Sequence, residues 1–235
     1  MKKTFALIIV TGLASSLQLA CAGEITGKIT LKGTPPKELE NNDIKSNADC
    51  SKSHPGPVTT HHFVVGTGGE LANVIVSLQG FSGKSTGASA TPVVLDQRGC
   101  EYIPTIIAVQ TDQKILVKNS DPVMHNVHPM PAVPGNKEDN KAQQANGPDL
   151  TFTFPKPENF LKVKCDIHPW MFAWIAVLDH PYFAVSGKDG AFTIANVPAG
   201  KYKIQAVHRK AGTVVQDIEV KEGEPAKADF TLEVK

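Results

Sequence analysis

The sequence lacks an excess of charge of either sign: 24 lysines and arginines stand against 23 aspartates and glutamates, a formal net charge of +1. Proteins that bind nucleic acid or anionic membranes usually carry a strong positive balance. We therefore expect neither among the partners. The sequence also lacks a convincing amphipathic helix pattern and a long internal repeat, which argues against helical bundles and solenoids.

Motifs that carry catalysis are also absent. The sequence contains neither a nucleophile elbow nor a phosphate-binding loop. The acidic residues of its central part form no recognisable pair of carboxylates: Glu101, Asp112, Asp121 and Asp166. Acid–base or nucleophilic catalysis needs such groups in defined pairs. We expect that the protein is not an enzyme.

The sequence has one long apolar run, Phe5–Leu19, which is shorter than the roughly 20 residues that a helix needs to cross a bilayer. It follows Lys2 and Lys3 and precedes the small residues Ala20-Cys21-Ala22. This order is typical of a cleaved export signal. We predict a signal peptide over residues 1–22, no membrane span, and a periplasmic or secreted mature protein.

A lipoprotein is the alternative reading of this segment, with Cys21 as the lipid-bearing residue. It is weakened by Gln18, which stands where a lipobox has an aliphatic residue. We favour cleavage over lipidation.

One stretch concentrates metal-binding chemistry: Cys165-Asp166-Ile167-His168-Pro169-Trp170-Met171. It holds a thiol, an imidazole and a thioether within seven residues, the ligand types that a type 1 copper site takes from one loop. Such a site needs a second imidazole from elsewhere in the chain. His125 is a candidate, 40 positions upstream of Cys165 (165 minus 125).

The order His…Cys-x-x-His-x-x-Met resembles the cupredoxins, the blue copper proteins of the amicyanin and plastocyanin type, and the amicyanins most closely. The segment Met124-His125-Asn126-Val127-His128 fits their upstream ligand loop, apart from the residue between Met and His. The resemblance implies one type 1 copper ion bound by His125, Cys165, His168 and Met171. It also implies that Asn126 ties the two ligand loops together and donates hydrogen bonds near the sulfur.

Other metal centres fit less well. A zinc site needs a second pair of Cys or His ligands, and the sequence has no second Cys-x-x-Cys/His. A binuclear copper centre needs two thiolates in one loop, whereas a multicopper oxidase needs histidines on both sides of the cysteine. The loop contains only one cysteine, and the neighbours of Cys165 are Lys164 and Asp166, so neither of these copper centres fits. A merely structural cysteine would leave the spacing of the other ligands to coincidence.

His128 is the rival of His125 as a ligand. The two lie three positions apart, so in an extended strand only one of them can reach the metal. The resemblance favours His125, and we expect His128 on the surface or behind the ligands.

Cysteines are few, and after the signal three remain: Cys50, Cys100 and Cys165. In an oxidising compartment an odd count reserves one thiol for another role. Metal binding by Cys165 accounts for it, and we predict a disulfide between Cys50 and Cys100.

From Glu24 onward, the pattern consists of short alternating strands separated by Gly, Pro, Asn and Asp, which predicts an all-β fold. We expect a Greek-key cupredoxin sandwich over residues 91–180. In the strand Phe172–Leu178 both faces are apolar, as in a strand inside a sandwich. The excursion Glu138–Asp149 is too polar to pack.

The C-terminal pattern Asp189-Gly190-x-Phe-x-Ile followed by Pro198-x-Gly-x-Tyr resembles the carboxypeptidase regulatory-like, or prealbumin-like, β-sandwich. The two strands that open this family occur far upstream, at Ile25–Ile29 and Leu71–Leu78. We therefore favour a discontinuous sandwich of residues 23–90 plus 181–235 with the cupredoxin inserted. Two consecutive domains are the alternative, which leaves the C-terminal part with only about four strands.

These features predict a monomeric one-electron carrier between redox protein partners. An exposed apolar collar around His168 would dock them, formed by Pro169 and Trp170 with Pro129, Met130 and Pro131. The alternative is a binding or scaffold module, or a copper-delivery protein, in which the cupredoxin domain is not a redox carrier.

Overall fold

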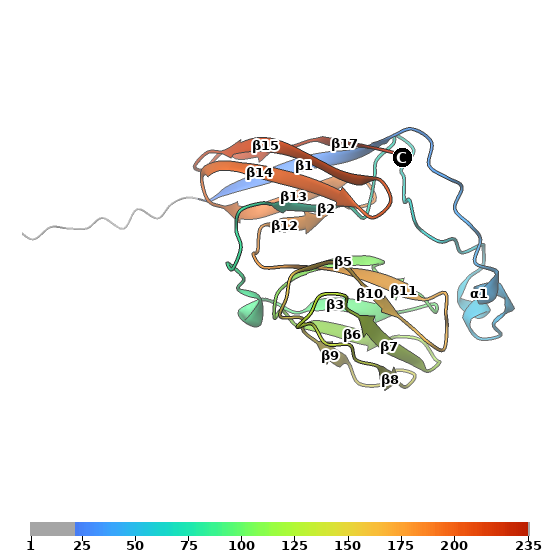
Figure 1. Ribbon diagram of the computed structural model, residues 1–235. Helices are drawn as coiled ribbons and strands as arrows, with labels where there is room; N and C mark the ends of the chain where they lie inside the picture. Colours follow the sequence, from blue (N-terminus) through green and yellow to red (C-terminus); the bar gives the residue numbers. More distant parts are fainter. Residues whose placement is uncertain (1–21, 235) are drawn as a thin grey trace, which may run out of the picture.

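The computed structural model describes residues 22–234. The predicted signal peptide lies outside this range except for Ala22. The described chain is an all-β protein of four sheets, which pack as two sandwiches (Figure 1). Within residues 22–234, no helix has the length and apolar character needed to cross a membrane.

The first sandwich takes strands from both ends of the chain. One sheet has the order β13-β1-β16, with β17 also paired to β1, and the other has the order β12-β2-β14-β15. The bounds are β1 Gly23–Lys32, β2 Ile75–Leu78, β12 Phe183–Val185, β13 Ala191–Val197, β14 Gly200–His208, β15 Gly212–Val220, β16 Pro225–Lys227 and β17 Phe230–Glu233. Whether this sandwich is prealbumin-like stays a prediction.

Strand β1 shows why the N-terminal pattern belongs to this sandwich. Ile25 and Ile29 are fully buried in its core. Between them, a Cβ atom on Gly27 would collide with the carbonyl oxygen of Ala228, because the C-terminal segment passes directly against the strand. In the Ile-x-Gly-x-Ile pattern, the two isoleucines therefore fill the core, and the glycine allows the close approach of a neighbouring backbone.

The second sandwich is formed by the chain between β2 and β12. Its sheets have the orders β5-β11-β10-β7-β8 and β4-β3-β6-β9. The bounds are β3 Val93–Gln97, β4 Tyr102–Ile103, β5 Ile106–Gln110, β6 Ile115–Asn119, β7 His125–Met130, β8 Lys141–Gln143, β9 Leu150–Phe152, β10 Glu158–Lys164 and β11 Phe172–Leu178.

Strand β11 is apolar on both faces because it is covered from both sides. Ala173, Ile175 and Val177 lie in the core of the second sandwich. Ala176 and Leu178 belong to a separate cluster that includes residues of β2 and β12 from the first sandwich. The first sandwich thus packs against the sheet that contains β11. The Cys165–Met171 loop directly precedes this strand in the sequence.

A long excursion between β1 and β2, here called the covering segment (residues 33–64), leaves the first sandwich, reaches the second and returns (Figure 1). The segment contains the short helix α1 Asn42–Ser46 and the 3-10 turn η1 Cys50–Ser53. A further 3-10 turn, η2, spans Gly87–Ser89. The predicted disulfide joins Cys50 of η1 to Cys100 of the second sandwich.

One expectation about packing is wrong. The excursion 138–149 does pack, because β8 pairs with β7 and the side chain of Gln143 is buried. Its amide accepts a hydrogen bond from Gln97 and donates to the backbone carbonyls of Val117 and Pro148. A polar side chain with such partners can be buried at little cost.

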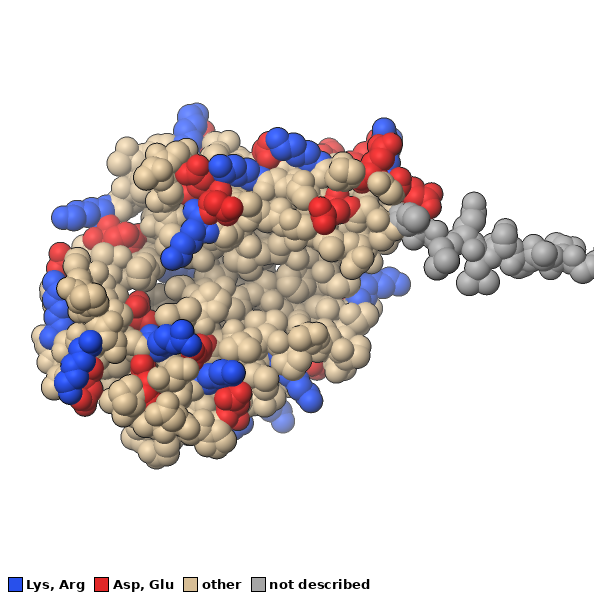
Figure 2. All heavy atoms as spheres, turned by 180° about the vertical axis from the view of Figure 1, so that it is seen from behind, with Lys and Arg blue, Asp and Glu red and all other residues tan. Residues whose placement is uncertain are grey.

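Charges of both signs are interspersed over the face of the molecule in Figure 2, without a field of one sign. Some exposed ion pairs join neighbouring strands, such as Lys203 on β14 with Asp217 on β15. This surface agrees with the balanced composition.

The disulfide sets a first prediction. It closes a separation of 50 residues, which in the chain-entropy account stabilises the fold by about 4 kcal/mol. Replacing Cys50 and Cys100 together by Ala should lower the free energy of unfolding by about that amount in denaturant titrations. Mass spectrometry of unreduced peptides checks the bond itself, and free thiols at both positions would contradict it.

His208 sets a second prediction. It is 2% exposed, and burial, aided by the charge of Arg209, lowers its pKa to about 4. Its Nδ1 accepts hydrogen bonds from the backbone N–H groups of Lys210 and Ala211, which requires a neutral ring.

The unfolded chain therefore binds a proton at higher pH than the folded one, so stability is lost as the pH falls from about 6.5 to 4, by about 3 kcal/mol in total. His208→Gln should flatten this slope in urea titrations across that range. An unchanged slope would contradict the assignment.

Candidate metal centre

The strand pairing brings the two ligand segments together. Strand β7 begins at His125, and β10 ends one residue before Cys165. The two strands pair antiparallel, with Lys164 opposite His128. The start of β7 and the end of β10 therefore lie at the same end of the sheet, and the loop from Cys165 to β11 closes over it.

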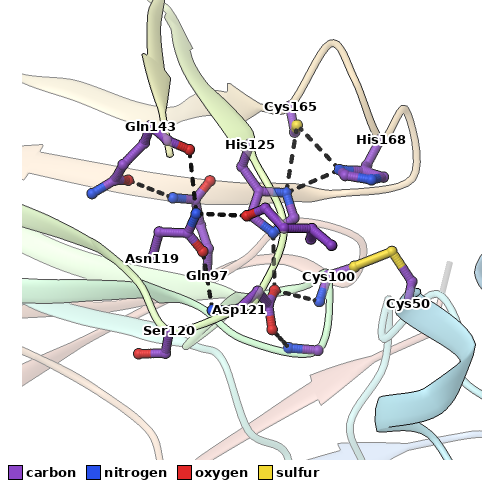
Figure 3. Close-up of polar contacts among 12 residues, drawn as sticks. Cys50, Gln97, Cys100, Asn119, Ser120, Asp121, His125, Gln143, Cys165 and His168 are labelled. Atoms are coloured by element: carbon purple, nitrogen blue, oxygen red, sulfur yellow. Dashed lines mark hydrogen bonds and ion pairs between the residues drawn. A yellow bond between two sulfur atoms is a disulfide. The ribbon is translucent and has the colours of Figure 1, made fainter. Parts of the chain in front are cut away.

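Three donor atoms converge there (Figure 3). The Nδ1 atoms of His125 and His168 are 2.9 Å apart, and Cys165 Sγ lies 4.0 Å from the first and 3.7 Å from the second. His125 and Cys165 are completely buried, and His168 is 6% exposed. Among residues 22–234, this trio is one of three groups whose possible ligand atoms all lie within 4.8 Å of one another.

The spacing suits a metal ion. Nitrogen and sulfur ligands at bond lengths of about 2.0–2.3 Å in one plane stand roughly 3.5–3.8 Å apart. The two sulfur–nitrogen distances, 3.7 and 4.0 Å, lie close to this range, and the nitrogen–nitrogen distance of 2.9 Å is shorter. His125 Nε2 lies 2.9 Å from the Asp121 carboxylate, so this nitrogen carries a proton, and in the neutral ring Nδ1 presents a lone pair to the other two donors. The donor set fits a metal cation.

Electrostatics favour the metal-binding forms of Cys165 and His168, but not that of His125. Burial alone would raise the pKa of the Cys165 thiol, but its contact with the His125 ring and the hydrogen bond from the backbone N–H of Asn126 lower it overall. Burial lowers the pKa of His168, and the nearby His125 lowers it further. For His125 burial acts downward as well, yet the bonds to Asp121 and Cys165 raise its pKa overall.

Met171, the last residue of the loop, is 1% exposed and belongs to the same core cluster as Cys165. Its backbone carbonyl accepts from Cys165 N at 3.1 Å, and its N–H donates to the His168 carbonyl at 2.8 Å. These two bonds fold the Cys-x-x-His-x-x-Met stretch into one compact loop.

Asn126 joins the two ligand segments. Its backbone N–H points at Cys165 Sγ from 3.5 Å. Its Oδ1 accepts from the N–H groups of Asp166 at 2.7 Å and Ile167 at 3.3 Å. The residue thus holds the Cys165 loop against β7 and supplies a donor to the sulfur.

His128 does not reach the trio. Its Nδ1 lies 2.8 Å from Asp166 and its Nε2 lies 2.7 Å from Glu138. The hydrogen bond with Glu138 raises its pKa, burial opposes this, and Asp166 adds to the rise. His128 therefore bridges two acidic side chains near the surface.

The residues predicted to form the apolar collar are not all exposed. Pro169 and Met130 are exposed, but Pro129 is buried. Trp170 is half-buried, with its ring 5.2 Å from that of His168 and its Nε1–H donating to the Cys100 carbonyl at 3.1 Å. The expectation overlooked Ile167, which is 44% exposed.

The disulfide lies beside the trio. The sulfur atoms of Cys50 and Cys100 and a ring nitrogen of His168 are all within 4.8 Å of one another. His168 thus lies close to both Trp170 and the disulfide. The covering segment borders a cavity of about 390 Å³ that is also lined by Trp170 and Met171.

Asp121 was overlooked at the sequence level. It is 3% exposed, contacts His125 directly and accepts hydrogen bonds from the backbone N–H groups of Gly99 and Cys100 (Figure 3). Burial acts to raise its pKa, but these bonds lower it overall. Only its position four residues before a candidate ligand could have drawn attention to it.

No family model and no curated protein matches this chain. Among solved structures, a copper-containing nitrite reductase (NirK) from Thermus scotoductus SA-01 is 21% identical over 38% of this chain, with a TM-score of 0.34; the match spans only 23% of the reductase. A methionine-to-alanine mutant of amicyanin with Cu(I) is 18% identical over 43% of this chain and 97% of its own, with a TM-score of 0.33. At such values the assignment of the centre stands on its own geometry.

Proposed function

We propose that the second sandwich is a cupredoxin-type domain that holds one type 1 copper ion and serves as a one-electron carrier. The observation that carries this is the convergence of Cys165 Sγ with the Nδ1 atoms of His125 and His168 in a buried place. One thiolate, two imidazoles and a thioether nearby in the chain form the donor set of blue copper centres, and a thioether is not among the usual ligands of zinc. Copper bound there would alternate between Cu(II) and Cu(I).

The protein's contribution is rigidity. Asn126, the loop bonds of Met171 and the contact with Asp121 hold the ligands before any metal arrives. Burial keeps water away from the thiol and the first imidazole. A site held in one geometry changes little between two oxidation states, which favours transfer of single electrons over chemistry on a substrate.

An oxidising location supports the same proposal. The Cys50–Cys100 disulfide is typical of exported proteins, and the predicted signal peptide would direct the chain there. We propose a periplasmic or secreted protein whose partners are redox proteins.

The proposed centre predicts a strong blue absorption. One equivalent of Cu(II) added to the purified protein should give an intense thiolate charge-transfer band in the visible spectrum, and Cys165→Ser should abolish it. His125→Ala should lose the band as well.

His128→Ala provides the matched control, since His128 bonds to Asp166 and Glu138 instead of facing the trio, and should keep the colour. A colourless wild-type complex would overturn the copper assignment. Ready release of Cu(I) to a chelator on each reduction would favour copper delivery over electron transfer.

Docking of a redox partner beside His168 sets a further prediction. Ile167 is exposed next to this ligand and Trp170 is tied to Cys100, so Ile167→Lys disturbs the surface with the least effect on the site. The variant should retain the blue band and exchange electrons with a physiological partner more slowly.

Val215→Lys is the control, because Val215 is equally exposed (45%) but lies on β15 of the first sandwich. Equal exchange rates for both variants and wild type would place the docking surface elsewhere.

A further inference from the structure

Asp121 is a buried charge next to a candidate metal ligand. It lies in the loop between β6 and β7, four residues before His125, and is 3% exposed. Removing a carboxylate from water is costly unless its oxygen atoms are fully hydrogen-bonded. A small polar or apolar residue would fill such a turn at lower cost. The charge therefore calls for a reason other than packing.

Both oxygen atoms of Asp121 have partners. Oδ1 accepts from the N–H of Gly99 at 2.6 Å. Oδ2 accepts from the N–H of Cys100 at 2.8 Å and lies 2.9 Å from His125 Nε2. The carboxylate is thus held by one turn of the backbone and directed at one ring nitrogen.

The contact determines which nitrogen of His125 is available. A carboxylate accepts and cannot donate, so Nε2 must carry the proton. The lone pair of Nδ1 then faces Cys165 Sγ and His168 Nδ1. Metal-binding histidines commonly have such a carboxylate behind them, which fixes the ring and raises its basicity. Among the described residues, His168 has no carboxylate partner of this kind.

The turn that holds Asp121 is itself fixed. Gly99 and Cys100 both have positive φ, at 66° and 55°, and Cys100 is bonded to Cys50 of the covering segment. The Cys100 carbonyl also accepts from Trp170, whose ring lies against His168. One turn therefore contacts the surroundings of both imidazoles.

From these contacts we propose that Asp121 is a positioning residue of the metal centre: its buried carboxylate selects the Nε2–H form of His125, fixes the ring, and places negative charge behind it that favours the more highly charged oxidation state of the metal. This rests on the copper function proposed above. The competing explanation is that Asp121 merely anchors the Gly99–Cys100 turn.

The test compares Asp121→Asn with Asp96→Asn. Asp96 is also a buried carboxylate, 8% exposed, but it bonds to Ser120 and Arg98 and contacts no candidate ligand. Binding of Cu(II) and of Cu(I) is measured separately by competition with chelators, and the reduction potential by voltammetry. A structural anchor would affect both oxidation states alike.

For Asp121→Asn we expect Cu(II) affinity to fall about 10- to 100-fold, and Cu(I) affinity to fall less. The reduction potential should then rise, by about 59 mV for each tenfold difference between the two losses. Asp96→Asn should leave the affinities and the potential at wild-type values. Equal losses for both oxidation states in Asp121→Asn, or a potential equal to that of wild type, would overturn the proposal.

A measurement on the metal-free wild-type protein covers the case in which the variant fails to fold. Nitrogen-15 chemical shifts of the His125 ring should show a protonated Nε2 and an unprotonated Nδ1; the opposite form would overturn the proposal. This measurement tests the role of Asp121 independently of the proposed copper function. The copper function would instead be refuted by a colourless wild-type protein with Cu(II).

Discussion

Two imidazole nitrogens and one sulfur face each other within 4.0 Å in a place almost closed to water. Lone pairs at that distance repel unless a proton or a cation lies among them, so the arrangement persists only if the surrounding chain holds each ring and the sulfur from behind. The second sandwich meets this constraint with paired strands, a compact ligand loop and hydrogen bonds to nearly every polar group around it.

The support is polar as well as apolar. Beneath the ligand segments, the Asn119 amide donates to the backbone carbonyls of Val123, Gln143 and Gln144, which ties the loop before β7 to β8. Among the described buried side-chain atoms, only Gln97 Oε1 has no partner. Networks this nearly complete stiffen a structure because shifting one member exposes the others. The loop that carries Asp121 and His125 is anchored in this way at its base.

Much of this was predictable because the relevant information is local in the sequence. Cys165, His168 and Met171 fall within seven residues, and the parity of the cysteines implied the Cys50–Cys100 pair. The alternation of apolar residues predicted most of the strands. Asp121 and Gln143 were not predictable, since an acid or an amide in a loop has no pattern until the fold supplies its partners. The burial of Pro129 likewise depends on the pairing of β7 with β10, which spacing alone does not reveal.

The two sandwiches also depend on one another. The first supplies Arg209, which lies over the ring of Trp174 on β11 at 4.2 Å, and the cluster around Ile75 covers the outer face of the same strand. Strand β11 follows directly after Met171, so a shift at this interface would pass into the ligand loop. The covering segment approaches from the other side through Cys50. Parts of the chain outside the second sandwich therefore border the ligand loop at two places, through β11 and through Cys50 beside His168, and the first sandwich acts as part of the frame of the candidate metal centre as well as a separate fold.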